Sequence, residues 1–284
     1  MSSNPLSLGY SPCPNDTFIF YALVHGKIPD TNLRFQEVLE DVETLNRMAG
    51  RSELDVTKAS FHAIGSLRET YCLLRAGAAL GRGCGPLIIS RREQDMTDLR
   101  GKTIAVPGTQ TTAFLLLQLF DPSLQNNIKV MPFNKIIDAV SGGDVEAGLV
   151  IHESRFTYQR AGLIKIIDLG EWWETETGLP LPLGGIIARR ALGPEVIRAV
   201  DTAVRRSVEY AFSHRDEPLP YIKKHSQEME TCVVEQHINL YVNDYSLDIG
   251  VDGAKAVEEM FRRAGEKGIM KKSGRGLFAL NQKA

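Results

Sequence analysis

Among the six histidines, His152 stands directly after a short apolar segment and could act as a general base. Residues 145–151 (VEAGLVI) are too few and too apolar for a surface helix and favour a strand buried on both faces. Ligands of open α/β sheets bind beyond the carboxyl ends of the strands, where a neutral imidazole can accept a proton near pH 7. A lone histidine at a strand end is also often structural, so the residue types alone leave both interpretations open.

A second candidate set, Lys58, Ala59 and Ser60, stands at the end of a predicted strand at 54–58. The alternating segment ELDV at 53–56 is echoed by DVEA at 144–147, an offset of 91 (144 − 53 = 91) that sets Ser60 beside the position of His152. A second echo relates GPLIISRR at 85–92 to GGIIARR at 184–190. These echoes predict two similar lobes with Ser60 and His152 at a shared cleft.

Two predicted helix starts could hold an anion. Thr111 and Thr112 follow a strand at 103–106 and a Pro-Gly turn, and Asn15 lies in a proline-fixed loop before a helix at 17–25. Exposed backbone N–H groups at such positions bind carboxylates or phosphates. Simple helix capping is the alternative at both places. The absence of GxxxxGK[ST] argues against a nucleotide P-loop.

Other chemistry finds less support in the sequence. The cysteines show no CxxC or Cys/His ligand spacing, and no HExxH occurs, so no metal site is predicted. Ser60 lacks a GxSxG context, which argues against a serine hydrolase. His62 begins a helix and could face the cleft. The remaining histidines lie in surface-like helical contexts and are expected to be solvated: His25, His214, His225 and His237.

Composition describes an ordinary globular chain of 284 residues with 43% hydrophobic and 24% charged residues. A net charge of −2 gives no reason to expect nucleic acid or an anionic membrane as a partner. No segment has the length of a membrane span, and MSSNPLSLGY lacks the basic and apolar parts of a secretory signal. A cytoplasmic protein with free thiols is therefore expected.

Alternating strand and helix patterns predict an α/β fold with mostly parallel sheets. Lobe one is predicted at 1–90 plus 188–284 and lobe two at 91–187, joined by two crossovers that form a hinge. The paired tryptophans at 172–173 are expected in an acidic loop that covers a lobe edge. Strands are expected at 6–10, 33–38, 54–58, 71–80, 87–90, 103–106, 128–131, 145–151, 163–169 and 186–189. Helices are expected at 17–25, 41–49, from 61, and at 113–120, 135–140, 194–214, 219–225, 233–242 and 253–264.

Six long motifs of the chain are compositionally unusual: SPCPNDTFIFYALVHG (11–26), LEDVETLN (39–46), ALGRGCGPLI (79–88), AVPGTQTTA (105–113), GLVIHESRFTY (148–158) and GEWWETETGLPLPLGGI (170–186). They resemble the 1,4-dihydroxy-6-naphthoate synthases of the futalosine route to menaquinone. The resemblance implies a two-lobe, periplasmic-binding-protein-like (type II) fold. It also implies cleavage of cyclic dehypoxanthinyl futalosine to 1,4-dihydroxy-6-naphthoate without a metal or organic cofactor.

The same resemblance implies a role for each candidate. His152 would be the general base, while Lys58, Ala59, Ser60 and the Thr111–Thr112 pair would hold the substrate, whose aryl carboxylate is an obvious guest. Contacts of Asn15, Asp16, His62 or Arg155 with the substrate are left open, as is a monomer or a dimer.

Three alternatives stay open beside this interpretation. A small-anion-binding protein of the same fold would be expected to carry an export signal. Chorismate dehydratase, from the same pathway, shares the fold, but the phrases SPCPNDTF and IHESRFTY favour the naphthoate synthase. A ligand-sensing domain would usually be joined to a signalling or DNA-binding module.

Overall fold

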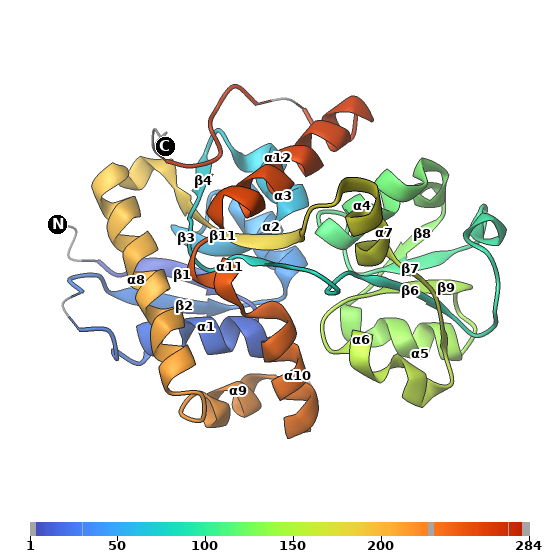
Figure 1. The fold of residues 1–284 in the computed structure, drawn as a ribbon, viewed down its shortest axis with the longest axis horizontal. Coiled ribbons are helices and arrows are strands. Elements are labelled where there is room, and N and C mark those ends of the chain that lie inside the picture. Colours follow the sequence, from blue (N-terminus) through green and yellow to red (C-terminus); the bar gives the residue numbers. More distant parts are fainter. Residues whose placement is uncertain (1–3, 30, 227–229, 272, 280–284) are drawn as a thin grey trace.

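Two β-sheets, each flanked by helices, lie at opposite ends of the long axis of the molecule (Figure 1). The computed structural model describes residues 4–29, 31–226, 230–271 and 273–279. One sheet has the strand order β2-β1-β3-β11-β4 with β5 added on β11, and the other has the order β10-β6-β9-β7-β8. Parallel and antiparallel pairs occur in both sheets. The predicted α/β architecture is confirmed, but the sheets are mixed rather than mostly parallel, because β6 and β11 run antiparallel to the strands that they pair with.

The strands are β1 (Leu6–Tyr10), β2 (Phe35–Leu39), β3 (Val56–Ser60), β4 (Tyr71–Leu73), β5 (Ala79–Gly81), β6 (Leu87–Ser90), β7 (Ile104–Val106), β8 (Ile128–Val130), β9 (Ala147–Val150), β10 (Ile164–Asp168) and β11 (Leu181–Arg189). The helices are α1 (Pro14–Val24), α2 (Val42–Gly50), α3 (Phe61–Leu67), α4 (Thr112–Phe120), α5 (Ile136–Ser141), α6 (Ser154–Thr157), α7 (Leu169–Thr177), α8 (Pro194–Ser213), α9 (Leu219–His225), α10 (Thr231–Tyr241), α11 (Asp244–Leu247) and α12 (Gly250–Glu266).

The internal repeat read from the sequence reappears in the strand pairing. Strand β11 runs antiparallel to β3, and β6 runs antiparallel to β9 in the same register. In each case the residue on β9 is 91 positions after its counterpart on β3 (149 − 58 = 91). The equivalent pairs are Ile186↔Lys58 with Ile88↔Leu149, and Ile187↔Thr57 with Ile89↔Gly148. Each lobe therefore contains an equivalent antiparallel strand pair, β3 with β11 in the first and β9 with β6 in the second.

The strand pairing bears on where the predicted lobes begin and end. Strand β6, assigned above to lobe one, pairs in the second sheet, and β11, mostly assigned to lobe two, pairs in the first. We therefore propose that the chain changes lobes between β5 and β6 and between β10 and β11. Each boundary moves by only a few residues, because each crossover segment leads straight into the strand that follows it, β6 or β11.

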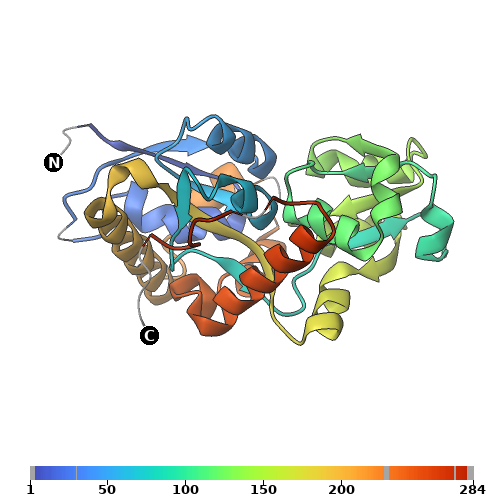
Figure 2. The ribbon, with the colours of Figure 1, turned by 90° about the horizontal axis from the view of Figure 1, so that it is seen from above.

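Helix α8 shows how the apolar pattern fixes a helix on its sheet. Its residues Ile197, Val200, Val204 and Val208 are buried, as the spacing predicts, and the helix packs beside α1 over the first sheet (Figure 1). At the other side, α12 reaches toward the second lobe (Figure 2). Lys267 Nζ, just after α12, donates to the carbonyl oxygen of Leu119, 2.6 Å away. This bond links the end of α12 to helix α4 of the second lobe.

Four predicted elements differ from the structure. The strand expected at 186–189 begins at Leu181, because the start of β11 pairs with β5. The helix expected at 17–25 begins at Pro14 with Cys13 as its N-cap, because proline needs no hydrogen-bond partner in a first turn. The strand expected at 71–80 is divided into β4 and β5. The tryptophans lie on helix α7, and Trp173 is fully buried with Nε1 donating to the Pro180 carbonyl, 3.1 Å away.

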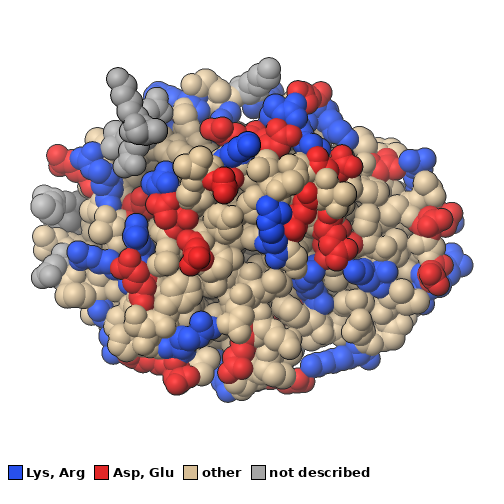
Figure 3. Space-filling view, viewed as in Figure 1, with Lys and Arg blue, Asp and Glu red and all other residues tan. Residues whose placement is uncertain are grey.

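The surface agrees with the near-neutral charge of the chain. On the face in Figure 3, lysine and arginine side chains are interspersed with acidic ones. Among the described residues, no helix has both the length and the apolar character needed to cross a membrane.

Candidate active site

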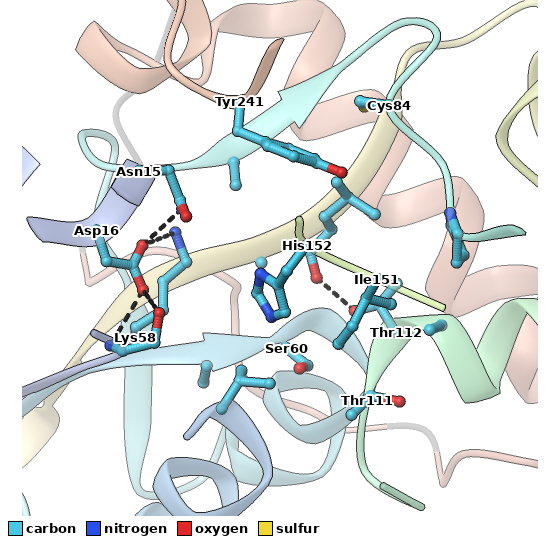
Figure 4. A pocket seen from close by; sticks show the side chains of 18 of the residues that line it. Asn15, Asp16, Lys58, Ser60, Cys84, Thr111, Thr112, Ile151, His152 and Tyr241 are labelled. Atoms are coloured by element: carbon cyan, nitrogen blue, oxygen red, sulfur yellow. Dashed lines mark hydrogen bonds and ion pairs between the residues drawn. The ribbon is translucent and has the colours of Figure 1, made fainter. Parts of the chain in front are cut away.

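The predicted site residues come together in one pocket between the two sheets (Figure 4). They are His152, Lys58, Ala59, Ser60, Thr111, Thr112 and Asn15. The rest of the lining was not predicted and is partly apolar: Ser11, Asp16, Val42, Ala79, Cys84, Pro86, Ala113, Ile151, Leu183, Gly184, His237 and Tyr241. Strand ends from both lobes and the start of one helix therefore meet at this pocket, as expected for a cleft at the carboxyl ends of strands.

His152 reaches the pocket through an unusual backbone conformation. Strand β9 ends at Val150, and His152 has a φ of 55°, in the left-handed region that non-glycine residues rarely adopt. Such strain persists where the surroundings impose it and is common at functional sites. The imidazole ring is 5.0 Å from the ring of Phe133 and lies parallel to that of His237 at 6.0 Å. The side chain is thus held between lobes.

The surroundings keep the His152 imidazole neutral. Burial lowers its pKa to about 4; Asp16 opposes this shift and Lys58 adds to it. At neutral pH a ring nitrogen therefore carries a lone pair that can accept a proton. This is the protonation state that a general base requires.

His237 was predicted to be solvated, and that prediction is wrong. Its side chain is completely buried on helix α10, and Nε2 lies 2.9 Å from Oδ1 of Asn15. The missed signal is the helical spacing of Val234, His237, Ile238 and Tyr241, which forms one buried stripe. Because α10 is amphipathic, the face that it turns inward carries His237 to the back of the pocket.

Lys58 is already paired within the pocket wall. Its Nζ lies 3.2 Å from Oδ1 of Asp16, and both side chains are almost completely buried. Asp16 also accepts hydrogen bonds from the Asn15 amide at 2.8 Å and from the Ser11 hydroxyl at 2.7 Å. Lys58 further donates to the carbonyl oxygen of Gly77. This network balances the lysine charge and fixes the first turn of α1, with Asn15 and Asp16 serving as network members rather than caps.

Ser60 is oriented by a residue that the sequence did not indicate. The Nδ2 of buried Asn46 donates to Ser60 Oγ at 3.1 Å, while Asn46 Oδ1 accepts from the Ser60 backbone N–H at 2.9 Å. Because a hydroxyl carries one donor and two acceptor positions, Ser60 can still donate its hydrogen to a guest. Asn46 lies in the LEDVETLN motif, but an asparagine on a helix has no distinctive spacing that would mark it.

The two threonines start helix α4, and their hydroxyls are engaged. Thr111 is the N-cap: its Oγ1 accepts from the Phe114 N–H at 3.2 Å and donates to the Gly108 carbonyl at 2.9 Å. Thr112 Oγ1 donates to the Leu183 carbonyl. Thr111 is therefore a helix cap that also lines the pocket, while anion binding at this helix start stays a prediction. The backbone N–H groups of the first turn of α4 lack intrahelical partners and could donate hydrogen bonds to a ligand.

Contacts across the cleft join the lobes beside the pocket. Glu43 Oε2 accepts from the Gln110 N–H at 3.1 Å, and Asn46 Nδ2 lies 3.3 Å from the Gln110 carbonyl oxygen. Burial raises the pKa of Glu43. His62 Nδ1 lies 3.2 Å from the Thr111 carbonyl oxygen, so this histidine supports the threonine loop from behind. These groups hold the lobes in the observed arrangement.

Arg155 acts on the crossover rather than the pocket. Its guanidinium lies 2.7 Å from Asp168 Oδ2 and donates to the carbonyl oxygens of Gly83 and Gly85. The charged neighbour raises the pKa of Arg155 against the opposing effect of burial. The arginine therefore links the segment before β6 to the end of β10.

Cys13, His152 and Glu153 are brought together, although their sequence spacing predicts no metal site. Their ligand atoms lie within 4.8 Å of one another. Thiol, imidazole and carboxylate are groups that can bind a divalent metal.

Two lobes with a pocket between them define a periplasmic-binding-protein-like fold. The structure is similar to a protein of Archaeoglobus fulgidus with a TM-score of 0.90 and 39% identity, covering 95% of this chain and 100% of that one. A Candida albicans protein described as having the generic periplasmic binding protein fold gives a TM-score of 0.69 at 15% identity (95% and 92% covered). The alkanesulfonate-binding protein of Xanthomonas axonopodis pv. citri gives 0.69 at 14% (95% and 96%). The predicted fold is confirmed.

The sequence comparisons identify the family. A family model described as menaquinone biosynthesis matches residues 6–266. A relative from Thermus thermophilus is 51% identical over 274 residues, covering 96% of this chain and 98% of the relative, and one from Streptomyces coelicolor is 47% identical (95% and 96%). Both are called 1,4-dihydroxy-6-naphtoate synthase. The chain belongs to this menaquinone biosynthesis family of enzymes, and the resemblance read from its motifs is confirmed.

Proposed function

We propose that this enzyme is a carbon–carbon lyase that converts cyclic dehypoxanthinyl futalosine to 1,4-dihydroxy-6-naphthoate. The activity is the one named for its relatives of 51% and 47% identity, which span nearly the whole chain. The observation that carries the proposal is the neutral imidazole of His152, turned into an interlobe pocket beside a helix start. A base and an anion-binding element in one cleft suit acid–base chemistry on a carboxylate.

The substrate carboxylate is assigned to the start of helix α4. Backbone N–H groups of Thr112 and Ala113 belong to its first turn, where the helix dipole also favours negative charge. The hydroxyl of Ser60, held by Asn46, supplies a further donor. Apolar pocket residues such as Ile151 and Leu183 suit the aromatic ring. Lys58 is assigned to the pocket wall, since its charge is balanced by Asp16.

His152 is assigned as the general base that starts the cleavage. A bound carboxylate nearby would favour the protonated imidazole and so raise its pKa from about 4 when the base is needed. Removal of a hydroxyl proton gives an alkoxide, which collapses to a carbonyl group as the C–C bond breaks in a retro-aldol-like step and leaves the electron pair on the other carbon. A small sugar-derived fragment leaves, and elimination and aromatisation of the ring supply the driving force. Contact between the lobes excludes water from the carbanionic intermediate.

The test is incubation of the purified protein with cyclic dehypoxanthinyl futalosine, without added metal, and detection of the naphthoate by mass. Loss of a general base should slow turnover by about 10²- to 10⁴-fold in His152→Gln. The matched control is His214→Gln, an exposed histidine that should keep full activity. Full turnover by a normally folded His152→Gln protein would refute the assigned base.

Two other outcomes would replace the proposed function. Turnover of chorismate instead would identify a chorismate dehydratase. Binding of an aryl carboxylate without turnover would identify a small-anion-binding protein with the same fold. We place the reaction in the cytoplasm, where a reducing environment suits the free cysteines Cys13, Cys72, Cys84 and Cys232. A monomer or a dimer is compatible with a pocket built within one chain.

A further inference from the structure

A buried cluster lies behind the imidazole of His152 and has no part in the proposed reaction. It consists of Cys13, Glu153 and His237, which are 4%, 5% and 0% exposed. Cys13 comes from the turn before α1, Glu153 follows His152, and His237 lies on α10. Ligand atoms of Cys13, His152 and Glu153 lie within 4.8 Å of one another. The turn before α1 and the segment after β9 thus bring three metal-binding groups together, and Nδ1 of His237 lies 4.0 Å from Oε2 of Glu153.

The hydrogen-bond network decides which nitrogen of His237 carries hydrogen. Asn15 Nδ2 donates to Asp16 Oδ1 at 2.8 Å, so Asn15 Oδ1 is the atom that faces His237 Nε2 at 2.9 Å. A carbonyl oxygen can only accept, and Nε2 must therefore be the donor. In the neutral ring, Nδ1 then carries a lone pair.

This lone pair points at another acceptor. Nδ1 of His237 lies 4.0 Å from Oε2 of Glu153 and has no hydrogen-bond partner in the described part of the chain. A buried imidazole lone pair without a hydrogen-bond partner is a group that can bind a metal ion.

We propose that this cluster binds Zn²⁺ through Cys13, His152 and Glu153, with Nδ1 of His237 as the fourth ligand. Thiolate, imidazole and carboxylate are the donors that zinc takes in tetrahedral sites. Ligand atoms in such a site lie roughly 3.3–3.8 Å apart for bond lengths of about 2.0–2.3 Å, so Cys13, His152 and Glu153 need to move inward by about 1 Å and the ring of His237 by more. The Nε2–H bond to Asn15 is the outer-shell contact that orients a metal-binding histidine.

Zinc binding would release a proton and remove the general base. The S–H bond of Cys13 breaks, a Zn–S bond forms, and the proton passes to solvent. The metal also takes the lone pair with which His152 accepts a proton. The zinc-bound enzyme is therefore inactive, and zinc is an inhibitor rather than a cofactor; this consequence rests on the proposed function.

The site is tested with metal-free, full-length protein titrated with Co²⁺ and then with Zn²⁺. We expect one equivalent of Co²⁺ to give a sulfur-to-cobalt charge-transfer band in the near ultraviolet, which Zn²⁺ then removes. Cys13→Ser should lose the band and bind Zn²⁺ at least about 10- to 100-fold more weakly. Serine is a favoured N-cap, so this variant preserves the start of α1.

Further variants separate this site from surface binding. His237→Gln should keep the cobalt band but weaken Zn²⁺ binding, because it replaces one ligand and leaves the thiol. Cys72→Ser, a change at another buried free cysteine, should leave both unchanged. A band that persists in Cys13→Ser, or no binding of one equivalent to the wild type, would overturn the proposal.

Turnover provides a second and independent readout. Zn²⁺ should inhibit the wild type and a chelator should restore it, whereas Cys13→Ser should be active and resistant to the same Zn²⁺ concentration. Equal inhibition of both proteins would show that zinc acts elsewhere and refute the proposed site. If neither protein turns over the substrate, the proposed function fails, while the cobalt spectra still decide the metal site.

Discussion

The buried ion pair between Asp16 and Lys58 should contribute to stability in a way that a double-mutant cycle can measure. The two side chains are 2% and 6% exposed, and Nζ lies 3.2 Å from Oδ1. Asp16→Asn preserves the shape but removes the charged partner of Lys58, whose ammonium group is left with neutral acceptors such as the Gly77 carbonyl. Breaking a buried pair by removing one partner costs about 3–5 kcal/mol. We expect a loss near 3 kcal/mol, because the asparagine oxygen can still accept.

The assay is urea unfolding of the two single variants and of Asp16→Asn/Lys58→Met. An apolar replacement of the second charge removes the unpaired ammonium, so the double variant should recover at least about 2 kcal/mol relative to Asp16→Asn. The control is Glu53→Gln, whose pair with Arg51 is exposed and screened by solvent, so that its loss should change the free energy of unfolding little. If Asp16→Asn costs no more than Glu53→Gln, or if the double variant recovers nothing, the reasoning from burial is wrong.

Three further predictions concern the pocket. The kcat/KM of the wild type should be constant at neutral pH and fall only as pH drops through about 4, because burial lowers the pKa of His152; His152→Gln should lack this limb. Asn46→Ala should raise KM at least about tenfold, since it frees the Ser60 hydroxyl and leaves a buried N–H unpaired at a cost of about 1–3 kcal/mol. Gly184→Ala should lower stability by about 1–3 kcal/mol in thermal unfolding, because its Cβ would lie 2.9 Å from a carbonyl oxygen of β3. Gly50→Ala, where nothing lies within 4 Å, is the control and should not destabilise.

Local patterns predicted most of the fold because its strands and helices follow ordinary periodicity. Helix α8 and the β-strands of both lobes lie close to their predicted positions. The errors occur where tertiary contacts decide. The tryptophans at 172–173 form part of α7 because Trp173 can bury its ring and donate to Pro180. We place the lobe boundaries a few residues from the predicted ones because pairing with a distant strand, rather than local composition, determines the sheet to which β6 and β11 belong.

The pocket residues that the sequence could reveal are those at strand ends and helix starts. His152, Ser60 and Thr111 stand at such positions. Asn46 and His237 do not, because each lies within a helix whose role in the site depends on how that helix packs. A histidine between apolar residues at helical spacing is the one signal that would have placed His237 inside. No spacing rule could have indicated that Asn46 would face Ser60.

The repeated strand pair explains why one lobe supplies a donor and the other a base. In the first lobe, β3 continues through Ser60 directly into α3, so the hydroxyl lies at a helix N-cap with ordinary backbone angles. In the second lobe, β9 ends one residue earlier in the equivalent register, and His152 turns back with a φ of 55°. At the offset of 91, the residue equivalent to Ser60 is Ile151 rather than His152 (151 − 60 = 91). His152 therefore lies one residue beyond the repeat, and this additional residue brings the imidazole into the cleft. A duplicated scaffold thus becomes asymmetric through a single strained residue, and that residue is the assigned base.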